Sequence, residues 1–210
     1  IIISTAAGSS RADPDFTFSY APPAIADVVT VATPTQSYLL PAGTASVPTA
    51  GIAVVLTGTN FGTAALGAGM LSLDGASDVV VTAQDHARLV AYLPPGDGTG
   101  HTLRFTVAGQ ASNVVTFRYA PPSVTGVSGD NGNHGPTAGG ASIVVTGVNF
   151  GVTQPSVTVG GAPCAVTEYG QSYVWCTTPA GMGRSQLVLV TLSGQTSAVV
   201  PAAVFHYDPP

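Results

Sequence analysis

The chain contains residues of the types that catalyse reactions, but their spacing matches no catalytic pattern. Serine, histidine and aspartate occur throughout, yet there is no Gly-x-Ser-x-Gly turn to expose a nucleophile and no His-Glu-x-x-His pair. Glu168 is the only glutamate, so the paired carboxylates of a glycosidase would have to come from scattered aspartates. The sequence therefore predicts no catalytic residues and favours a protein that is not an enzyme.

One loop offers several oxygen atoms that could bind a cation. Residues 129–136 read Gly-Asp-Asn-Gly-Asn-His-Gly-Pro, which leaves a calcium site as the alternative to a plain turn-rich loop. The ligand order of an EF-hand is absent, and a single carboxylate binds a hard cation weakly. The histidines, at positions 86, 101, 134 and 206, have no metal-ligand spacing. We therefore expect neither a metal nor a cofactor.

Two cysteines, Cys164 and Cys176, stand twelve positions apart without a second pair. A zinc site usually needs four ligands, so a single disulfide is the better interpretation, with two buried free thiols as the alternative. A disulfide indicates an oxidising compartment. The pair thus favours an extracellular or cell-surface protein that passes through the secretory pathway.

The charge of the chain excludes some classes of partner. Its 210 residues include no lysine, and five arginines stand against ten acidic residues. A nucleic-acid binder gains much of its affinity by neutralising phosphates, so we expect no nucleic-acid partner. No stretch approaches the roughly 20 apolar residues of a membrane-spanning helix. Because the first residue is Ile rather than Met, we expect a segment of a longer or processed protein.

An aromatic pair closed by two prolines occurs three times, and it must lie at the end of a strand. Phe and Tyr two positions apart share one face of a strand, where both rings can enter a core. Proline cannot donate to a sheet ladder, so each strand must stop there, and paired prolines stiffen the link to the next domain. The predicted joint residues are Phe18, Tyr20, Pro22, Pro23, Phe117, Tyr119, Pro121, Pro122, Phe205, Tyr207, Pro209 and Pro210.

A second repeated motif divides the chain into units. Gly58–Gly62 reads Gly-Thr-Asn-Phe-Gly and recurs as Gly-Val-Asn-Phe-Gly at Gly147–Gly151, at almost the same distance from the next aromatic pair. We therefore expect two homologous domains, at 24–122 and 123–210. Residues 1–23 match only the end of a unit, and are predicted to be the C-terminal hairpin of a preceding domain.

Short strands are the elements that position these motifs. β-branched and aromatic runs separated by glycine and proline recur about seven times in 90 residues, without a helical pattern, which predicts an all-β fold of two β-sandwiches. The expected strands are 51–57, 70–73, 88–93, 103–107 and 115–119 in the first unit and 141–146, 156–159, 173–177 and 185–192 in the second. In the Asn-Phe-Gly turns the phenylalanine is expected to enter the core while Asn or Gly adopts positive φ.

Two features of the second unit are candidates for a contact surface. The run 185–192 is apolar on both faces, and the simplest register leaves Val188 and Val190 facing outward as a contact strip, with cover by a loop as the alternative. Tyr173 and Trp175 form either an aromatic binding platform or a core tryptophan beside the disulfide.

The order of the motifs resembles the IPT/TIG family of immunoglobulin-like domains. In the second unit these motifs are Gly147–Gly151, Val159–Cys164, Cys176–Pro179 and Phe205–Pro210. The resemblance implies an immunoglobulin-like sandwich of the early-set type for each unit, and it implies a disulfide between Cys164 and Cys176. The first unit departs from the pattern, because its equivalents of the cysteines fall near Asp78 and Ala91.

The resemblance and the composition together lead to two hypotheses about function. The first is a structural or adhesive extracellular segment whose repeats form a semi-rigid rod or surface fibre, with neighbouring repeats of the same or like chains as partners. The second is a receptor-ectodomain or carbohydrate-associated binding module with surface proteins or glycans as partners. A Rel-like DNA-binding domain shares the fold, but it needs a basic face that this chain lacks. Ser, Thr and Pro-rich stretches permit O-linked sugar, although the composition does not show it.

Overall fold

The computed structural model describes residues 4–5, 8–9, 19–33, 36–40 and 46–209. Within these residues the chain is all-β, with a single turn of 3-10 helix. The elements are β1 Ser4–Thr5, β2 Gly8–Ser9, β3 Ala24–Thr33, β4 Gln36–Leu40, β5 Ser46–Val47, β6 Ile52–Thr59, η1 Ala64–Leu66, β7 Met70–Leu73, β8 Ala76–Gln84, β9 Arg88–Leu93, β10 His101–Val107, β11 Gln110–Ala111, β12 Val115–Tyr119, β13 Ser123–Gly129, β14 His134–Gly135, β15 Ser142–Val148, β16 Ser156–Val159, β17 Ala162–Tyr169, β18 Tyr173–Thr177, β19 Gln186–Leu192, β20 Gln195–Thr196 and β21 Val204–Tyr207.

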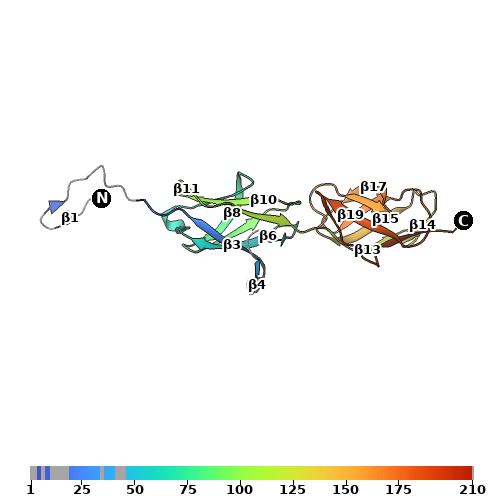
Figure 1. The fold of residues 1–210 in the computed structure, drawn as a ribbon, viewed down its shortest axis with the longest axis horizontal. Coiled ribbons are helices and arrows are strands. Elements are labelled where there is room, and N and C mark those ends of the chain that lie inside the picture. Colours follow the sequence, from blue (N-terminus) through green and yellow to red (C-terminus); the bar gives the residue numbers. More distant parts are fainter. Residues whose placement is uncertain (1–3, 6–7, 10–18, 34–35, 41–45, 210) are drawn as a thin grey trace.

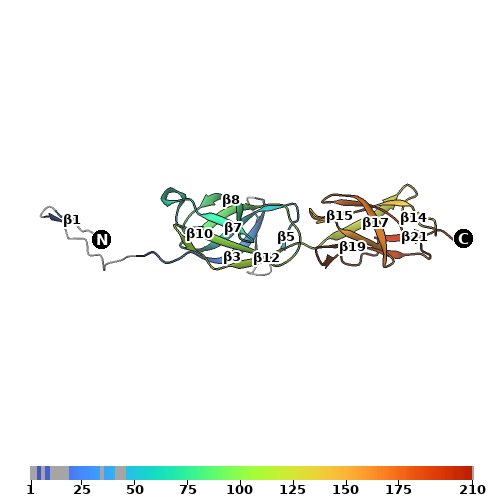
Figure 2. The ribbon, with the colours of Figure 1, turned by 90° about the horizontal axis from the view of Figure 1, so that it is seen from above.

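The strands form two immunoglobulin-like sandwiches that lie end to end (Figure 1). In the first sandwich one layer has the strand order β3-β6-β9-β8 and the other β7-β10-β12, with β8 pairing to both β9 and β7. The second sandwich repeats this arrangement as β13-β15-β18-β17 and β16-β19-β21, with β17 in the bridging position. The view from above shows the same end-to-end order (Figure 2).

Each sandwich has its own hydrophobic core. The first core is built around residues such as Leu56, Leu103 and Phe105, and the second around residues such as Val145, Val190 and Phe205. These side chains come from alternate positions of facing strands, because successive residues of a strand point to opposite faces. The expected all-β sandwich fold is therefore confirmed.

The Asn-Phe-Gly turns have the predicted geometry in both sandwiches. Asn60 and Asn149 adopt positive φ angles of 61° and 60°, and the next residues, Phe61 and Phe150, are fully buried. The backbone amide of Phe61 donates to the carbonyl of His86, in the loop between β8 and β9, and that of Phe150 donates to the carbonyl of Gln171, in the loop between β17 and β18. Each turn therefore closes one end of its sandwich with an aromatic plug.

The aromatic pairs close the last strand of each sandwich. Phe117 and Tyr119 are buried with their ring centroids 5.4 Å apart, and Phe205 and Tyr207 are buried at 5.2 Å, in both cases edge to face. The Tyr119 hydroxyl donates to the carbonyl of Pro94, in the loop between β9 and β10, at 2.9 Å. The Tyr207 hydroxyl donates to the carbonyl of Pro179, in the equivalent loop between β18 and β19, at 2.8 Å. The expectation that both rings enter a core is confirmed for these two pairs. Phe18 and Pro210 lie outside the described residues.

Most of the predicted N-terminal hairpin also lies outside the described residues. The structure pairs β1 with β2, through Ser4 with Ser9 and Thr5 with Gly8. Of the segment 16–20, which leads to the first proline pair, it describes only Ser19 and Tyr20, which are not in a strand. Tyr20 is 78% exposed, unlike its counterparts Tyr119 and Tyr207.

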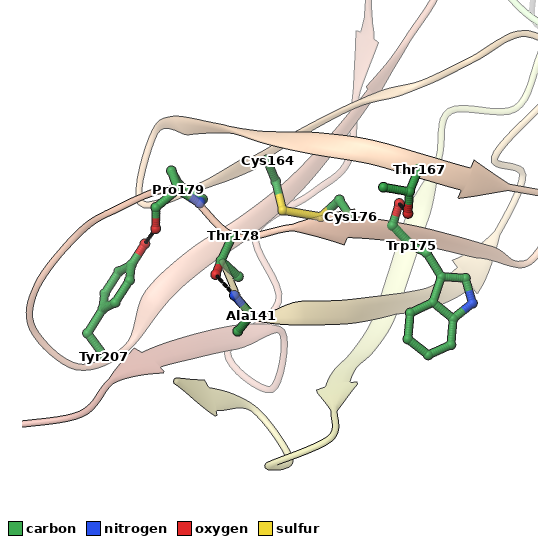
Figure 3. Close-up of a disulfide and its surroundings, with 8 residues drawn as sticks. All are labelled: Ala141, Cys164, Thr167, Trp175, Cys176, Thr178, Pro179 and Tyr207. Atoms are coloured by element: carbon green, nitrogen blue, oxygen red, sulfur yellow. Dashed lines mark hydrogen bonds between the residues drawn. A yellow bond between two sulfur atoms is a disulfide. The ribbon is translucent and has the colours of Figure 1, made fainter. Parts of the chain in front are cut away.

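The disulfide joins β17 to β18 inside the second sandwich (Figure 3). Cys164 and Cys176 are both buried, with their Cα atoms 5.6 Å apart. In the first sandwich the equivalent of Cys164 is Val79 rather than Asp78. Leu71 of β7 pairs with Val79 in the same way as Val157 of β16 pairs with Cys164. Val79 and Ala91 are buried there, so apolar packing replaces the bridge.

The expected contact strip at Val188 and Val190 is wrong. Both side chains are buried in the second core, at 1% and 0% exposure, where β19 pairs with Val159 and Val157 of β16. Val188 and Val190 therefore face the core instead of the solvent, and Leu187, which is 38% exposed, lies on the outer side of the strand. The cause is that a strand apolar on both faces carries no alternation from which to assign its inner face.

Candidate functional site

The two sandwiches meet at a joint made of loops, with one carboxylate of the first sandwich at its centre. Asp97 lies between β9 and β10 in the loop Gly96-Asp97-Gly98. Its Oδ2 accepts hydrogen bonds from the backbone amides of Val152 (3.1 Å) and Thr153 (3.0 Å) and from the Thr153 hydroxyl (3.0 Å). Its Oδ1 accepts from the hydroxyl of Ser193 at 2.5 Å. All of these donors belong to the second sandwich.

The surroundings of Asp97 favour its ionised form. Burial acts to raise the pKa of this carboxyl, but the hydrogen bonds from Ser193, Thr153 and Val152 outweigh it and hold the pKa below its ordinary value. Hydrogen bonds to a charged acceptor are stronger than those between neutral groups. The joint therefore depends on an anion of one sandwich bound by neutral donors of the next.

His101, which belongs to the same sandwich as Asp97, holds the loop that carries Asp97. The Nε2 atom of His101 lies 3.0 Å from the carbonyl oxygen of Asp97, and its Nδ1 atom lies 2.7 Å from Oδ2 of Asp74. The His101 ring also packs edge to face against Tyr119, with the centroids 5.1 Å apart. Burial acts to raise the pKa of Asp74, but the hydrogen bonds from His101 and Thr102 together keep it lowered. Asp97 is thus oriented before the second sandwich docks.

Thr49 makes a second set of contacts across the joint. Its hydroxyl donates to Oε1 of Gln171 at 2.5 Å, and its carbonyl accepts from Nε2 of the same side chain at 3.1 Å. The backbone amide of Thr49 donates to Oδ1 of Asn149 at 3.4 Å. Thr49 is fully buried although it is polar. Because a buried polar group is costly without partners, these contacts indicate a specific interface.

A third contact across the joint involves the repeated motif of an aromatic pair followed by two prolines. The side-chain amide of Gln195 donates to the carbonyl of Tyr119 at 3.2 Å. The same contact occurs at the start of the first sandwich, where Gln110 donates to the carbonyl of Tyr20 at 2.8 Å and Asn60 donates to that of Pro22 at 3.2 Å. Gln110 and Gln195 hold equivalent positions, each directly after a turn glycine of positive φ.

The predicted joint residues form the covalent part of this site, and Tyr119 also contributes its carbonyl to a contact across it. Pro121 is exposed and Pro122 is buried in the three-residue link, residues 120–122, between β12 and β13. Sequence reasoning did not identify the side chains that cross the joint. The repeated Gly-Gln at 109–110 and 194–195 was a usable signal, whereas Asp97 had none, because the second unit has Met182 at that position.

The other candidate residues are not part of the joint. In the loop 129–136, His134 pairs with Asp208 at 2.9 Å and Asn133 donates to the carbonyl of Val204. Among the described residues no group of three or more His, Cys, Asp or Glu is placed to hold a metal ion. The part of the chain that the structure covers also contains no helix long and apolar enough to cross a membrane.

Tyr173 and Trp175 lie together on an outer face of the second sandwich. They alternate along β18 with the buried Val174 and Cys176, so Trp175 points away from the disulfide, as Figure 3 shows. Both rings are half-buried, and the hydroxyl of Tyr173 donates to Oε1 of Glu168 at 2.9 Å. The hydrogen bond to Glu168 raises the pKa of Tyr173. A core tryptophan beside the disulfide is therefore excluded.

Comparisons with known proteins agree with this architecture. The family model of the IPT/TIG domain matches residues 122–207. The chain is 27% identical to mouse (Mus musculus) Fibrocystin-L over 119 residues, which is 57% of this chain and 3% of that protein. It is 31% identical to human (Homo sapiens) Fibrocystin-L over 93 residues, which is 44% of this chain and 2% of that protein. The chain thus spans only a few per cent of the length of these relatives.

Two solved structures show partial similarity to this chain at low sequence identity. The full extracellular region of plexin A4 is similar over 89% of this chain and 18% of its own, at 16% identity and a TM-score of 0.42. A surface glycan-binding protein from Prevotella bryantii is similar over 88% of this chain and 42% of its own, at 16% identity and a TM-score of 0.47. The sandwich topology, the Asn-Phe-Gly turn, the disulfide and the family match all agree. Residues 122–207 of this chain are an IPT/TIG domain.

Proposed function

We propose that the chain is a structural or adhesive segment of an extracellular or cell-surface protein, in which sandwiches at 24–122 and 123–210 form a semi-rigid rod or surface fibre. The observation that supports this most directly is Asp97, which receives its hydrogen bonds from Val152, Thr153 and Ser193 of the next sandwich. A flexible tether needs no such contacts. On this proposal the main partners of each sandwich are its neighbours in the array.

The contacts resist rotation because they are spread over the joint. Together, Asp97, Thr49 and the carbonyl of Tyr119 bind three loops of the second sandwich: the turn between β19 and β20, the loop after β15, and the loop between β17 and β18. Three contacts that do not share one axis oppose both bending and twisting. The link contains two prolines, so it loses little conformational entropy when the joint forms. Each hydrogen bond to the Asp97 carboxylate contributes about 1.5–3 kcal/mol to the stability of the joint, and less where water competes for the carboxylate.

The buried disulfide supports placement outside the cytosol, since a bridge of this kind persists in oxidising compartments. The contact between Gln110 and the carbonyl of Tyr20 supports the proposal that residues 1–23 end a preceding domain. It reproduces the contact between Gln195 and Tyr119 at the joint between the two sandwiches. We expect the array to continue through equivalent joints.

Small-angle X-ray scattering of the intact chain tests this proposal. The unchanged protein should give the scattering curve of one fixed end-to-end arrangement. Asp97→Asn should need a broad ensemble of bent arrangements, because an amide cannot accept four hydrogen bonds as a carboxylate does. Asp130→Asn is a matched control, since it removes the same charge from an exposed loop away from the joint. Equal flexibility of the unchanged protein and Asp97→Asn would refute a semi-rigid joint.

A second function has support from the outer face of β18. Tyr173 and Trp175 are half-buried aromatic rings beside the Glu168 carboxylate, an arrangement on which a sugar ring can stack and donate hydrogen bonds. This would make the chain a glycan-binding module. Trp175 is the only tryptophan, so its fluorescence would report binding of an oligosaccharide directly. Retention on a glycan array that Trp175→Ala abolishes would favour this function over a purely structural one.

A further inference from the structure

The outer face of β18 can be compared, position by position, with the outer face of β9 in the first sandwich. Trp175 of β18 pairs with Glu168 of β17. Val90 of β9 pairs with Ala83 of β8 in the same way. The first sandwich therefore has two small apolar side chains where the second has an indole and a carboxylate.

A third position of this face also differs between the sandwiches. Tyr173 of β18 pairs with Thr146 of β15, and Arg88 of β9 pairs with Thr57 of β6. The threonine is thus the same in both sandwiches, while a tyrosine stands in place of the arginine. Because the first sandwich forms a complete core without these aromatic and acidic residues, core packing does not account for them.

The two aromatic rings of this face are placed for stacking. Residues two apart on a strand project from the same face, about 7 Å apart along the strand. Trp175 points away from the disulfide, as Figure 3 shows. The ring of Tyr173 lies against Gly170, where a Cβ atom would be 2.8 Å from its Cε1. The rings therefore suit a ligand with an apolar planar side, such as a sugar ring.

Polar atoms lie at the edge of the rings. Oε1 of Glu168 accepts the hydroxyl of Tyr173 at 2.9 Å, and a carboxylate has further acceptor sites on both oxygens. Within the described part of the chain, Nε1 of Trp175 has no hydrogen-bond partner, and it is not among the buried polar atoms. The face thus offers one free donor and several acceptor sites to a ligand.

The charge of this face favours a cationic ligand. The second sandwich contains no lysine and a single arginine, Arg184, which lies in the loop that follows the far end of β18 from Tyr173. Among the residues that the structure describes, Glu168 forms no ion pair. A carboxylate attracts cations and repels anions, and the faces of aromatic rings also attract cations.

We propose that the outer face of β18 binds glycans whose sugar units carry a protonated amine, and that it selects them over neutral and acidic glycans. The inference rests on the glycan-binding function proposed above and names the ligand class. The apolar side of a sugar ring stacks on Trp175, while its ammonium group lies against the ring of Tyr173 and donates to Glu168. Opposite residues of antiparallel strands have Cβ atoms about 4.5–5.5 Å apart, so one sugar unit can reach both Trp175 and Glu168.

A lysine side chain of a protein offers the same ammonium group but a different surface. Its flexible chain covers little of an indole ring, and fixing its rotatable bonds costs entropy that a rigid sugar ring does not lose. The pair of Tyr173 and Trp175 therefore favours a glycan, and a lysine peptide is the competing ligand to test.

The fluorescence of Trp175, the only tryptophan, measures binding to the intact chain. The probes are β-1,4-linked tetramers of glucosamine, glucose and glucuronic acid, which share ring and linkage but differ in charge. A tetralysine peptide is the fourth probe, and mildly acidic buffer keeps the amines protonated. The glucosamine tetramer should bind several-fold more tightly than the glucose tetramer, and the glucuronic acid tetramer should bind most weakly. Added salt should reduce these differences, because the charges are near the surface.

A matched pair of substitutions isolates the role of the carboxylate. Glu168→Gln keeps an acceptor for the hydroxyl of Tyr173 but removes the charge, so the glucosamine tetramer should bind no more tightly than the glucose tetramer. Binding of the glucose tetramer should stay within about twofold, since Trp175 still supplies the stacking surface. Asp130→Asn removes the same charge from an exposed loop of the same sandwich and should leave the preference unchanged.

Equal affinity of the unchanged protein for the glucosamine and glucose tetramers would overturn the proposal and leave the glycan-binding function standing. Loss of the preference in Asp130→Asn as well as in Glu168→Gln would also overturn it, because the selectivity would then come from net charge. Tighter binding of tetralysine than of the glucosamine tetramer would overturn it in favour of a protein ligand. If no oligosaccharide binds, by fluorescence and by calorimetry, both this proposal and the glycan-binding function fail.

Discussion

Asp97 shows how much a joint can depend on one side chain. It is held by His101 on its own sandwich and bound by three residues of the next. Only a residue that accepts several hydrogen bonds at once can serve there, which is why a carboxylate fits. At the equivalent position of the second sandwich Met182 lacks this capacity, although its loop makes the same backbone hydrogen bonds.

The lowered pKa of Asp97 makes the joint sensitive to acid. A lowered pKa means that the stabilisation is complete above the ordinary pKa of about 3.9 and is lost as the pH falls through the lower value of the docked state. The amide chemical shifts of Val152 and Thr153, followed by NMR, should titrate with a midpoint below about pH 3.9. The titration should vanish in Asp97→Asn. A midpoint above the ordinary value would show that these amides do not favour the ionised carboxyl.

The disulfide should stabilise only the second sandwich. Replacing Cys164 and Cys176 with alanine should lower its unfolding free energy by about 3 kcal/mol, because the bridge closes a short loop in the unfolded chain. Urea unfolding followed by Trp175 fluorescence measures this, since the single tryptophan is in that sandwich. Hydrogen exchange at Phe105 in the first core should not change. An unchanged urea midpoint would contradict a stabilising bridge.

At the scale of elements, the Asn-Phe-Gly turn has two separate tasks. Its phenylalanine plugs the core, as in Phe61 and Phe150. Its final glycine gives space to the neighbouring sandwich, since a side chain at Gly151 would collide with Leu192 and reach Asp97. The first task was predictable from the sequence, but the second depends on the neighbouring sandwich being in place.

A matched pair of substitutions separates these tasks. Gly151→Ala and Gly62→Ala should each cost about 1–2 kcal/mol of folding stability because both backbones have φ near 75°, and Gly151→Ala should cost more because its methyl also collides with the buried Leu192. Only Gly151→Ala should also open the joint, since Gly62 has no atom closer than 3.8 Å to its added methyl. Thermal unfolding measures the first effect, and amide protection of Thr49 measures the second. A joint that stays closed in Gly151→Ala would contradict the close approach of Asp97 to this glycine.

Structural elements could be predicted where a motif is repeated, and could not be predicted where no motif is repeated. The aromatic plugs and the burial of the paired rings follow from spacing that occurs twice, whereas β3, β8, β13 and β17 are not among the predicted strands. The inner face of β19 does not follow from the sequence, because Leu187 and Val188 are equally apolar and alternation gives no answer. The joint contacts are missed for another reason: Asp97, Thr49 and Gln171 come together from loops distant in sequence.

At the scale of the whole molecule, two sandwiches with separate cores are held in line by polar contacts at their ends. Such a joint is specific, because its hydrogen bonds form only in one relative orientation. A hydrophobic interface of the same size would tolerate sliding. On the proposed function, the stiffness of the rod therefore depends on a few loop residues rather than on the cores.

Residual dipolar couplings test the central claim most directly. Backbone couplings of the two sandwiches, measured in one aligned sample, give an alignment tensor for each. We predict that the two tensors agree in magnitude and direction, as for a single rigid body, and that they diverge in Asp97→Asn but not in Asp130→Asn. Two different tensors in the unchanged protein would show that the sandwiches move independently, and would contradict a joint fixed by Asp97.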